Sequence, residues 1–320
     1  MENSRLDEEW ALTVDHLVKV YGNGKVAVDD ISFKVKKGSL FAFLGVNGAG
    51  KSTTINIICS ILEKTSGRIV LEGHDLERER TAVKNIIGVV FQNSVLDNML
   101  SVYDNLRFRT AFYSLSNEEA KNRIEEITNL LELRPILKQK VGTLSGGQKR
   151  RVDIARAIVH APKFLILDEP TTGLDPKTRQ IVWELIDKVR KETGMTVFLT
   201  THYLEESDLA TYVVIMDKGH IITEGSPNEL KNRFSRDYLI VYRKLDKEFE
   251  KRLREDHLEF DYDTDKKSYR IVIKDTNEAK ALLGRYGDEM ADIEIKKGTM
   301  DDVFLSVTGR KNHGIEEEND

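Results

Sequence analysis

A glycine-rich segment at residues 45–52, GVNGAGKS, has the composition of a loop that binds phosphate groups. Gly45, Gly48 and Gly50 allow the backbone to turn tightly, so that successive N–H groups and the next helix N-terminus face one anion. Lys51 adds a positive charge for β- and γ-phosphates, and the Ser52 hydroxyl is suited to bind Mg²⁺. The alternative is a glycine-rich turn that only opens a helix. The full pattern favours nucleotide binding by Gly45, Asn47, Gly48, Ala49, Gly50, Lys51, Ser52 and Thr53.

An apolar run that ends in two carboxylates occupies residues 164–170, FLILDEP. Ligands bind at the carboxyl ends of strands in open α/β sheets, so Asp168 and Glu169 are expected at that edge. Asp168 is suited to hold Mg²⁺ through water, and Glu169 to act as general base on an attacking water. An isolated LDEP is equally consistent with a carboxylate pair that caps a strand. The phosphate loop earlier in the chain favours the catalytic interpretation.

Residues 144–148, LSGGQ, precede an apolar and basic stretch with helical character. Ser145, Gly146, Gly147 and Gln148 at a helix start predict a second anion site made of backbone donors and the positive end of the helix dipole. The local alternative is a simple N-cap. One chain does not need two γ-phosphate sites for one ATP. We therefore expect a head-to-tail homodimer in which each LSGGQ closes over the nucleotide of the other chain.

These three segments, in this order, resemble the ATP-binding cassette (ABC) ATPases over about residues 12–230. The resemblance implies a P-loop α/β fold with a mixed core sheet, an antiparallel β part and a helical subdomain, together with Mg²⁺-dependent ATP hydrolysis. Gln92 in VVFQN matches the glutamine that senses metal and water. The implied catalytic residues are Glu169, His202 and Gln92, and the implied metal ligands are Ser52, Gln92 and Asp168.

Three further residues take their expected roles from the same resemblance. His202 in FLTTH matches the histidine that binds the γ-phosphate, and Asp175 in GLDP matches the aspartate of the dimer interface. Tyr21 has the position of the aromatic ring that stacks on adenine. Taken alone, a histidine after a strand is more often a surface or capping residue. A tyrosine near a strand end is commonly plain β-packing.

Composition narrows the possible partners and location. The 320 residues carry a net charge of −5, which gives no reason to expect nucleic-acid binding, and a single cysteine, Cys59, which fits a cytosolic compartment. Apolar runs have strand length and fall short of the roughly 20 residues of a membrane-spanning helix. The N-terminus is acidic, unlike a signal peptide. We expect a soluble polypeptide without direct membrane insertion.

Short apolar runs alternate with amphipathic stretches in the first two hundred residues, which indicates an α/β domain with a largely parallel sheet. Strands are expected at 11–18, 30–36 and 39–45, and a helix from Lys51 with Ile55, Ile57, Ile58, Ile61 and Leu62 on its inner faces. Helical periodicity at about 101–140 predicts a helical subdomain at about 93–160. The expected nucleotide-binding domain is residues 1–230.

The pattern changes after Pro227. Strands are expected at 237–243, 268–274 and 290–296, and helices at 246–255 and 277–286. This order predicts a small α+β module at 231–310 of the βαββαβ, ferredoxin-like type. An amphipathic stretch at 300–309 precedes a polar tail, 311–320, that is expected to be disordered.

The end of the chain, KGTMDDVFLSVTGRK, resembles the ATPase subunits of two-component drug, antibiotic and sodium exporters. That resemblance implies a separate membrane permease subunit, and a cytoplasmic location on the inner face of the cell membrane. Two alternatives remain at this point. One is a soluble ABC ATPase that acts on ribosomes or nucleic acid, although the chain has one cassette and no zinc-ligand cysteines or basic blocks. The other is that residues 231–320 form a ligand-sensing module.

Overall fold

The computed structural model describes residues 9–309, and the chain divides into two compact units between Glu224 and Gly225. We expected the division near residue 230, which lies inside helix α8 (Pro227–Phe234). Helix α8 contacts helix α11 (Met300–Thr308), so the whole of α8 belongs to the C-terminal unit. The expected disordered tail, 311–320, lies outside the described residues.

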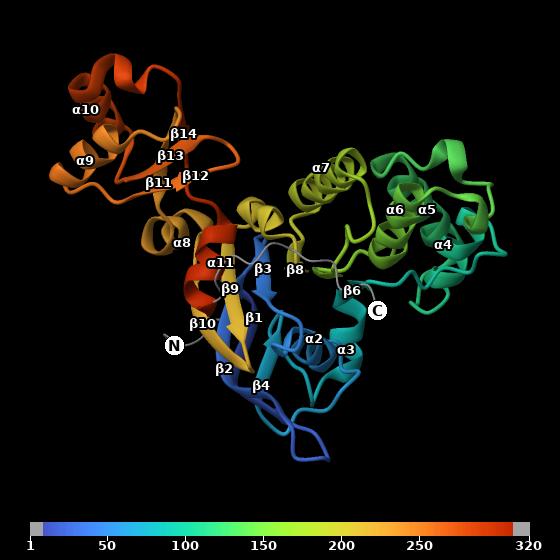
Figure 1. The fold of residues 1–320 in the computed structure, drawn as a ribbon. Coiled ribbons are helices and arrows are strands. Elements are labelled where there is room, and N and C mark those ends of the chain that lie inside the picture. The colour runs from blue at the N-terminus through green and yellow to red at the C-terminus, as the bar shows by residue number, and fades with distance from the viewer. Residues whose placement is uncertain (1–8, 310–320) are drawn as a thin grey trace. The chain divides into compact units, whose positions relative to one another are not determined.

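A six-stranded sheet in the order β10-β9-β3-β8-β7-β6 forms the core of the first unit (Figure 1). Its strands are β3 Leu40–Gly45, β6 Ile87–Val90, β7 Phe164–Asp168, β8 Thr196–Thr200, β9 Tyr212–Asp217 and β10 His220–Gly225. The strands from β9 to β6 pair in parallel. All residues of β3 and β8 are buried, as is usual for parallel strands covered on both faces. The segments after β3, β7 and β8 therefore meet at one edge of the sheet.

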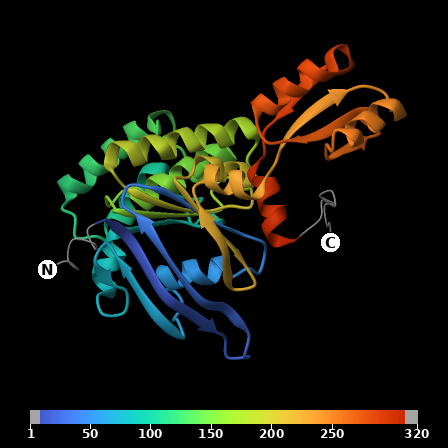
Figure 2. The ribbon, with the colours of Figure 1, turned by 90° about the vertical axis from the view of Figure 1, so that its left-hand side faces the viewer.

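An antiparallel sheet with the order β2-β1-β4-β5 completes the β structure of this unit. Its strands are β1 Trp10–Val20, β2 Val26–Lys36, β4 Ser66–Leu71 and β5 His74–Asp75. The β1–β2 hairpin is the dark blue pair of arrows in Figure 2, and Tyr21 opens its turn. The ring of Phe33 on β2 packs against Phe41 and Phe198 of the parallel sheet, with centroids 5.7 and 6.3 Å away. The two sheets therefore share one hydrophobic core.

Outside the helical subdomain, the strands of the first unit are connected by α2 Lys51–Ile58, α3 Arg80–Ile86 and α7 Pro176–Thr193. The expectation that Ile61 and Leu62 lie on inner faces of α2 is wrong, because both follow the end of the helix, although Leu62 is partly buried against the core. The helix ends at Ile58 with Cys59 as its C-cap, Ser60 has a φ of 56°, and Ile61 is 61% exposed. Burial raises the pKa of the Cys59 thiol to about 12, which makes it unreactive near neutral pH.

The helical part of the first unit comprises α4 Val102–Thr110, α5 Asn117–Leu130 and α6 Gly146–Ile158, grouped in green in Figure 1. These three helices contact one another. Their buried positions follow a helical period, as in Ile124 and Ile127 of α5. Together with the two sheets, they confirm the predicted α/β fold with a mixed core sheet, an antiparallel part and a helical subdomain.

The C-terminal unit contains a four-stranded antiparallel sheet in the order β12-β13-β11-β14. Its elements are β11 Asp237–Tyr242, α9 Lys247–Glu255, β12 Phe260–Asp263, β13 Ser268–Ile273, α10 Thr276–Tyr286, η4 Gly287–Met290 and β14 Ile293–Lys296. The order of elements is βαββαβ, as in ferredoxin-like folds. Sequence periodicity missed β12, because four residues are too few to display an alternating pattern.

Candidate nucleotide-binding and catalytic site

The loop between β3 and α2 has the backbone that a phosphate site requires. Gly45 and Gly50 have φ values of 159° and 109°. A Cβ atom would lie 2.6 Å from the Met216 carbonyl oxygen at Gly45 and 2.5 Å from the Ala27 carbonyl oxygen at Gly50. Only glycine fits both positions. The loop can therefore turn against β9 and β2 and direct its N–H groups and the start of α2 toward an anion.

The Lys51 side chain is directed back along this loop. Its Nζ donates to the carbonyl oxygens of Gly45, at 2.6 Å, and Val46, at 3.1 Å, and the residue is 8% exposed. Burial lowers the pKa of Lys51, and the nearby carboxylates of Glu169 and Asp168 oppose that shift. A buried cation held only by carbonyl groups suits exchange of these partners for phosphate oxygens, which bind a cation more strongly.

The other loop residues divide between the surface and the core. Asn47, Gly48 and Ser52 are exposed, whereas Ala49 is buried beneath them. The Ser52 hydroxyl is therefore accessible to a cation at the phosphate loop. Thr53, half-buried in the first turn of α2, has its hydroxyl 3.2 Å from the Tyr21 hydroxyl.

Tyr21 itself is 37% exposed, and the Lys19 ammonium lies 5.3 Å from the centre of its ring. The tyrosine is thus beside the helix that follows the phosphate loop, although it is 32 positions away from Thr53 in the sequence. A partly exposed ring at this place is suited to contact a nucleotide base. Stacking on adenine stays a prediction.

Three of the predicted site residues meet at the carboxyl end of β7. Glu169 Oε2 accepts a hydrogen bond from Gln92 Nε2 at 2.9 Å and lies 3.2 Å from His202 Nδ1. The Thr172 hydroxyl donates to the same oxygen at 3.2 Å. Glu169 has a φ of 46°, an uncommon conformation for a residue with a side chain, and such strain is concentrated at functional sites. The arrangement is suited to orienting a water molecule between Glu169, as general base, and the polar side chains around it.

Asp168 lies one residue earlier, at the end of the same strand. Its Oδ1 accepts a hydrogen bond of 2.6 Å from the Thr200 hydroxyl at the end of β8. Burial raises the pKa of Asp168, an effect that the Thr200 hydrogen bond and the Lys51 charge oppose. A carboxylate near a buried lysine and an accessible serine hydroxyl fits the oxygen donor set that Mg²⁺ prefers.

We expect Asp168→Asn to stabilise the fold slightly and to abolish Mg²⁺-dependent hydrolysis. Because the pKa of Asp168 is raised above its unfolded value, ionisation at neutral pH favours the unfolded chain, and a neutral amide removes that disadvantage. The Asn Oδ1 can still accept from Thr200. Thermal unfolding at pH 7 and ATPase assays with titrated Mg²⁺ test both effects. A melting temperature below that of the wild type, or retained turnover, would contradict the assignment.

Sequence reasoning missed Arg150, a buried residue of α6 with three carbonyl partners. Its guanidinium donates to the oxygens of Phe91 at 2.8 Å, Gln92 at 3.0 Å and Glu169 at 3.3 Å. Burial lowers its pKa, and the charges of Asp153 and Asp168 oppose the shift. Arg150 therefore joins the helix that starts at Ser145 to both Gln92 and Glu169. Charged residues at 150 and 153 on the apolar side of a helix were the available signal.

The LSGGQ segment and Asp175 lie beside each other within one chain. Ser145 caps α6: its hydroxyl accepts from Gln148 N at 3.3 Å, and Gln148 Oε1 accepts from Ser145 N at 2.9 Å. Asp175 caps α7 and accepts from Thr178 N at 3.0 Å. A Cβ atom at Gly147 would lie 2.3 Å from Thr178 Cγ2, so glycine permits close contact between the two helix starts. The hydrogen bonds of Ser145 and Asp175 are thus local, and do not run to Glu169 or Lys51.

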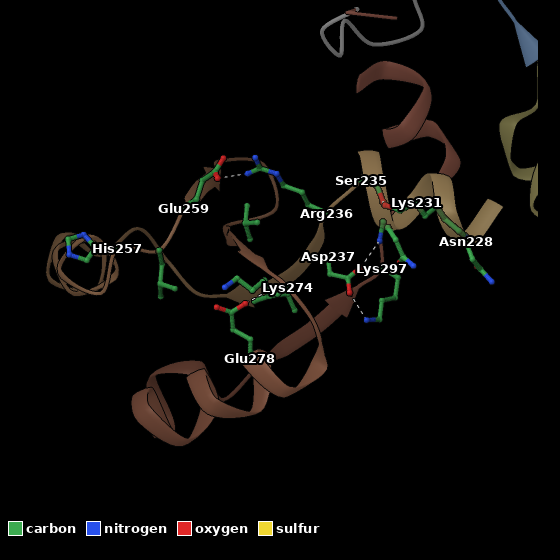
Figure 3. Close-up of a pocket in the computed structure, with 15 residues that line it drawn as sticks. Asn228, Lys231, Ser235, Arg236, Asp237, His257, Glu259, Lys274, Glu278 and Lys297 are labelled. Atoms are coloured by element: carbon green, nitrogen blue, oxygen red, sulfur yellow. Dashed lines mark hydrogen bonds and ion pairs between the residues drawn. The ribbon is translucent and has the colours of Figure 1, made fainter. Parts of the chain in front are cut away.

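A cavity of about 850 Å³ lies within the C-terminal unit and contains none of the predicted site residues (Figure 3). Its charged groups largely pair with one another. Asp237 accepts from Lys297 Nζ and from the Gly298 N–H, and Arg236 pairs with Glu259. The charges that line the cavity are of both signs, and the Ser235 hydroxyl donates to the Lys231 carbonyl oxygen at 2.7 Å rather than to a side-chain base. The chemistry of this chain therefore lies at the edge of the parallel sheet.

None of the helices within residues 9–309 has both the length and the apolar composition needed to cross a bilayer.

Known families and relatives match both parts of this architecture. A family described as ABC transporter matches residues 28–172, and one described as ATP-binding protein DrrA1-3-like, C-terminal domain, matches residues 225–308. The doxorubicin resistance ATP-binding protein DrrA of Mycobacterium tuberculosis is 36% identical over 94% of this chain and 95% of its own length. The linearmycin resistance ATP-binding protein LnrL of Bacillus subtilis is 34% identical over 93% and 98%.

Solved structures of ATP-binding proteins from the same family have a similar fold. CbiO1 of Clostridium perfringens, part of the ABC transporter complex CbiONQ, covers 70% of this chain and 91% of its own, with 33% identity and a TM-score of 0.66. A dimeric post-hydrolysis state of the ATP-binding cassette MJ0796, bound to ADP and Pi, has 29% identity and a TM-score of 0.60, and covers 67% of this chain and 98% of its own. The chain therefore belongs to the ATP-binding subunits of ABC transporters, is an ATPase of that family, and has drug-resistance ATP-binding proteins of the DrrA type among its relatives.

Proposed function

We propose that this ATPase forms a homodimer around two Mg·ATP and drives a separate membrane permease that acts as an exporter. The observation that carries the hydrolytic part is the convergence of Gln92, Thr172 and His202 on one oxygen of Glu169. The names of the relatives, which refer to resistance to doxorubicin and linearmycin and to Nod factor export, support an exporter.

In the proposed mechanism, the loop at 45–53 and Lys51 bind the phosphates, and the Tyr21 ring stacks on adenine. Lys51 leaves the carbonyl groups of Gly45 and Val46 for the β- and γ-phosphate oxygens. Ser52, Gln92 and Asp168 would hold Mg²⁺, which neutralises phosphate charge when it is bound. Glu169 then accepts a proton from water, and His202 contacts the γ-phosphate.

The dimer follows from the second anion site. Ser145, Gly146 and Gly147 form the N-terminus of α6, a helix of 13 residues, which is long enough for its dipole to attract an anion. Within the described part of the chain, however, the Ser145 side chain bonds only to its own helix, at Gln148 N. We infer that this N-terminus closes over the γ-phosphate bound by the partner chain, with Asp175 at the interface. In this arrangement the first unit, which ends at Glu224, carries the nucleotide chemistry, and the C-terminal unit serves docking or dimer stability.

Residues 95–112 supply an apolar surface for the permease. The exposed apolar side chains in this range are Val95, Met99, Leu100, Tyr103, Phe108 and Phe112. Phe108 and Phe112 are 65% and 66% exposed, and their rings meet edge to face with centroids 5.5 Å apart. Exposed apolar clusters of this kind are typical of protein contacts. The segment begins three residues after Gln92, so a permease bound there would act directly on the catalytic loop. It would also keep the subunit on the cytoplasmic face of the membrane.

The double variant Phe108→Ser, Phe112→Ser should weaken binding to the permease by about tenfold or more, because it removes two exposed aromatic anchors. ATP hydrolysis by the isolated subunit should stay within about twofold of wild type, since surface changes on a helix rarely alter the fold. Co-purification with a candidate permease, a multi-spanning membrane protein to be sought among the neighbouring genes, measures the effect.

Ile61→Ser is the matched control, because Ile61 is 61% exposed and lies outside residues 95–112. It should leave the complex intact. Wild-type binding by the double variant would mean that the permease contacts another surface.

A further inference from the structure

A buried carboxylate with no assigned role, Glu206, lies in the short helix η3 (Leu204–Leu209), four residues after His202. Glu206 is 3% exposed, and the three hydrogen-bond donors that it meets are all neutral. Burial of a carboxylate is unfavourable unless hydrogen bonds satisfy both oxygens. A buried carboxylate whose hydrogen bonds are all satisfied makes the surrounding structure rigid and fixes its geometry.

Both oxygens of Glu206 act as acceptors. Oε1 accepts from the Thr171 hydroxyl and from Trp183 Nε1, the latter at 2.9 Å, and Oε2 accepts from the Thr201 hydroxyl at 2.6 Å. An indole N–H can only donate. The Thr201 oxygen already accepts from Tyr203 N at 3.0 Å, so its own proton is directed to Glu206. A glutamine would place an N–H₂ group against one of these donors.

The three donors come from three parts of the catalytic region. Thr171 follows Glu169 by two residues, Thr201 directly precedes His202, and Trp183 lies on α7, the helix that Asp175 caps. Thr171 and Thr201 are 0% and 1% exposed, so water does not compete for their hydroxyl groups. Glu206 thus joins the backbone on the N-terminal side of His202 to the loop after Glu169.

We propose that Glu206 is a positioning residue for ATP hydrolysis, which holds Thr201 and therefore sets the position of His202 relative to Glu169. The proposal rests on the proposed contact between His202 and the γ-phosphate. Arg179 supports the same segment from α7, because its guanidinium stacks on the Tyr203 ring at 4.0 Å and pairs with Glu205. His202 is thereby held from both sides, by Thr201 and by Tyr203.

Glu206→Gln should lower kcat by about 10- to 100-fold, the loss expected when a reacting group is displaced by about 1 Å. The KM for Mg·ATP should stay within about threefold of wild type, because the residues that bind phosphates and base are outside this hydrogen-bond network. Glu184→Gln is the matched control: Glu184 is exposed on α7, beside Trp183, and undergoes the same change of charge. It should leave kcat unchanged.

A double mutant separates positioning from general stabilisation. In a His202→Ala background, Glu206→Gln should reduce kcat by no more than about twofold, because residues that act through one another have non-additive effects. Equal losses in both backgrounds would make Glu206 merely structural and overturn the proposal. Wild-type turnover in His202→Ala alone would remove the proposed role of His202. An impaired His202→Ala with an unimpaired Glu206→Gln would overturn only the role of Glu206.

Trp183→Phe provides a milder variant, since it removes one donor and retains an aromatic ring. Thermal unfolding establishes that each variant is folded. If Glu206→Gln does not fold, a kcat loss of about 3- to 10-fold in Trp183→Phe, absent in the His202→Ala background, supports the proposal. Unchanged kcat in folded Trp183→Phe would then refute it.

Discussion

Replacing Glu169 with glutamine is expected to slow ATP hydrolysis by about 10²–10⁴-fold, or about 3–5 kcal/mol in activation free energy. Gln92, Thr172 and His202 all direct polar atoms at Glu169 Oε2, and a neutral amide there loses the ability to accept a proton from water. Nucleotide affinity should be retained, because the phosphates bind to the loop at 45–53. The ATP-bound dimer should therefore accumulate.

Turnover in single- and multiple-turnover assays, nucleotide dissociation constants and light scattering with Mg·ATP measure these effects. Glu63→Gln is the matched control, with the same change of charge at a side chain that is 84% exposed. Wild-type turnover in Glu169→Gln would remove the residue from its role as general base. Loss of nucleotide binding would instead mean that its charge supports the phosphate site.

The second large effect is expected from Ser145→Arg, which should abolish hydrolysis although Lys51 and Glu169 of the same chain remain intact. In a composite site, the arginine would occupy the place of the partner's γ-phosphate. Lys51→Ala should also be inactive, for a different reason, since it weakens nucleotide binding itself. A mixture of the two inactive proteins forms heterodimers with one doubly damaged and one intact site. Some activity should therefore return if one intact site turns over alone.

Ser116→Arg is the matched control for the helix cap. Ser116 and Glu119 form the same capping box at α5 as Ser145 and Gln148 form at α6, and loss of either cap costs about 1 kcal/mol of stability. Ser116→Arg should unfold at a similarly lowered temperature and still hydrolyse ATP. Full activity of Ser145→Arg at concentrations where the protein is monomeric would refute composite sites.

The nucleotide-binding elements were predictable because each is a local pattern. The glycines at 45 and 50 require positive φ values that other residues rarely adopt, and the apolar run before Asp168 requires a buried strand. Helix starts were visible for the same reason, as at Ser145. The prediction for Ile61 failed because a helical period in the sequence does not indicate where a helix ends, and Ser60 ends it with a φ of 56°.

The residues that support the catalytic groups were not predictable in this way. Arg150 and Glu206 belong to segments that read as ordinary amphipathic helix and loop, and their partners lie 19 to 59 and 5 to 35 positions away in the chain. A charged side chain in such a segment is expected on the surface. Only the packed structure reveals that carbonyl groups satisfy Arg150, and that Glu206 is buried with hydroxyl and indole N–H groups as its partners.

By itself, the sequence determined the local features that carry the chemistry of this protein: a phosphate loop, a carboxylate pair at a strand end, a capped helix start that we propose as a second anion site, and the order in which they occur. Backbone conformation and residue type specify those features over a few neighbouring residues. The tertiary structure alone decided that Gln92, Thr172 and His202 meet at one oxygen of Glu169, and that Arg150 and Glu206 hold these segments in place. The physical reason is that the register of β3, β8 and β7, and the packing of α6 against β6 and α7, depend on hydrogen bonds and apolar contacts between distant parts of the chain.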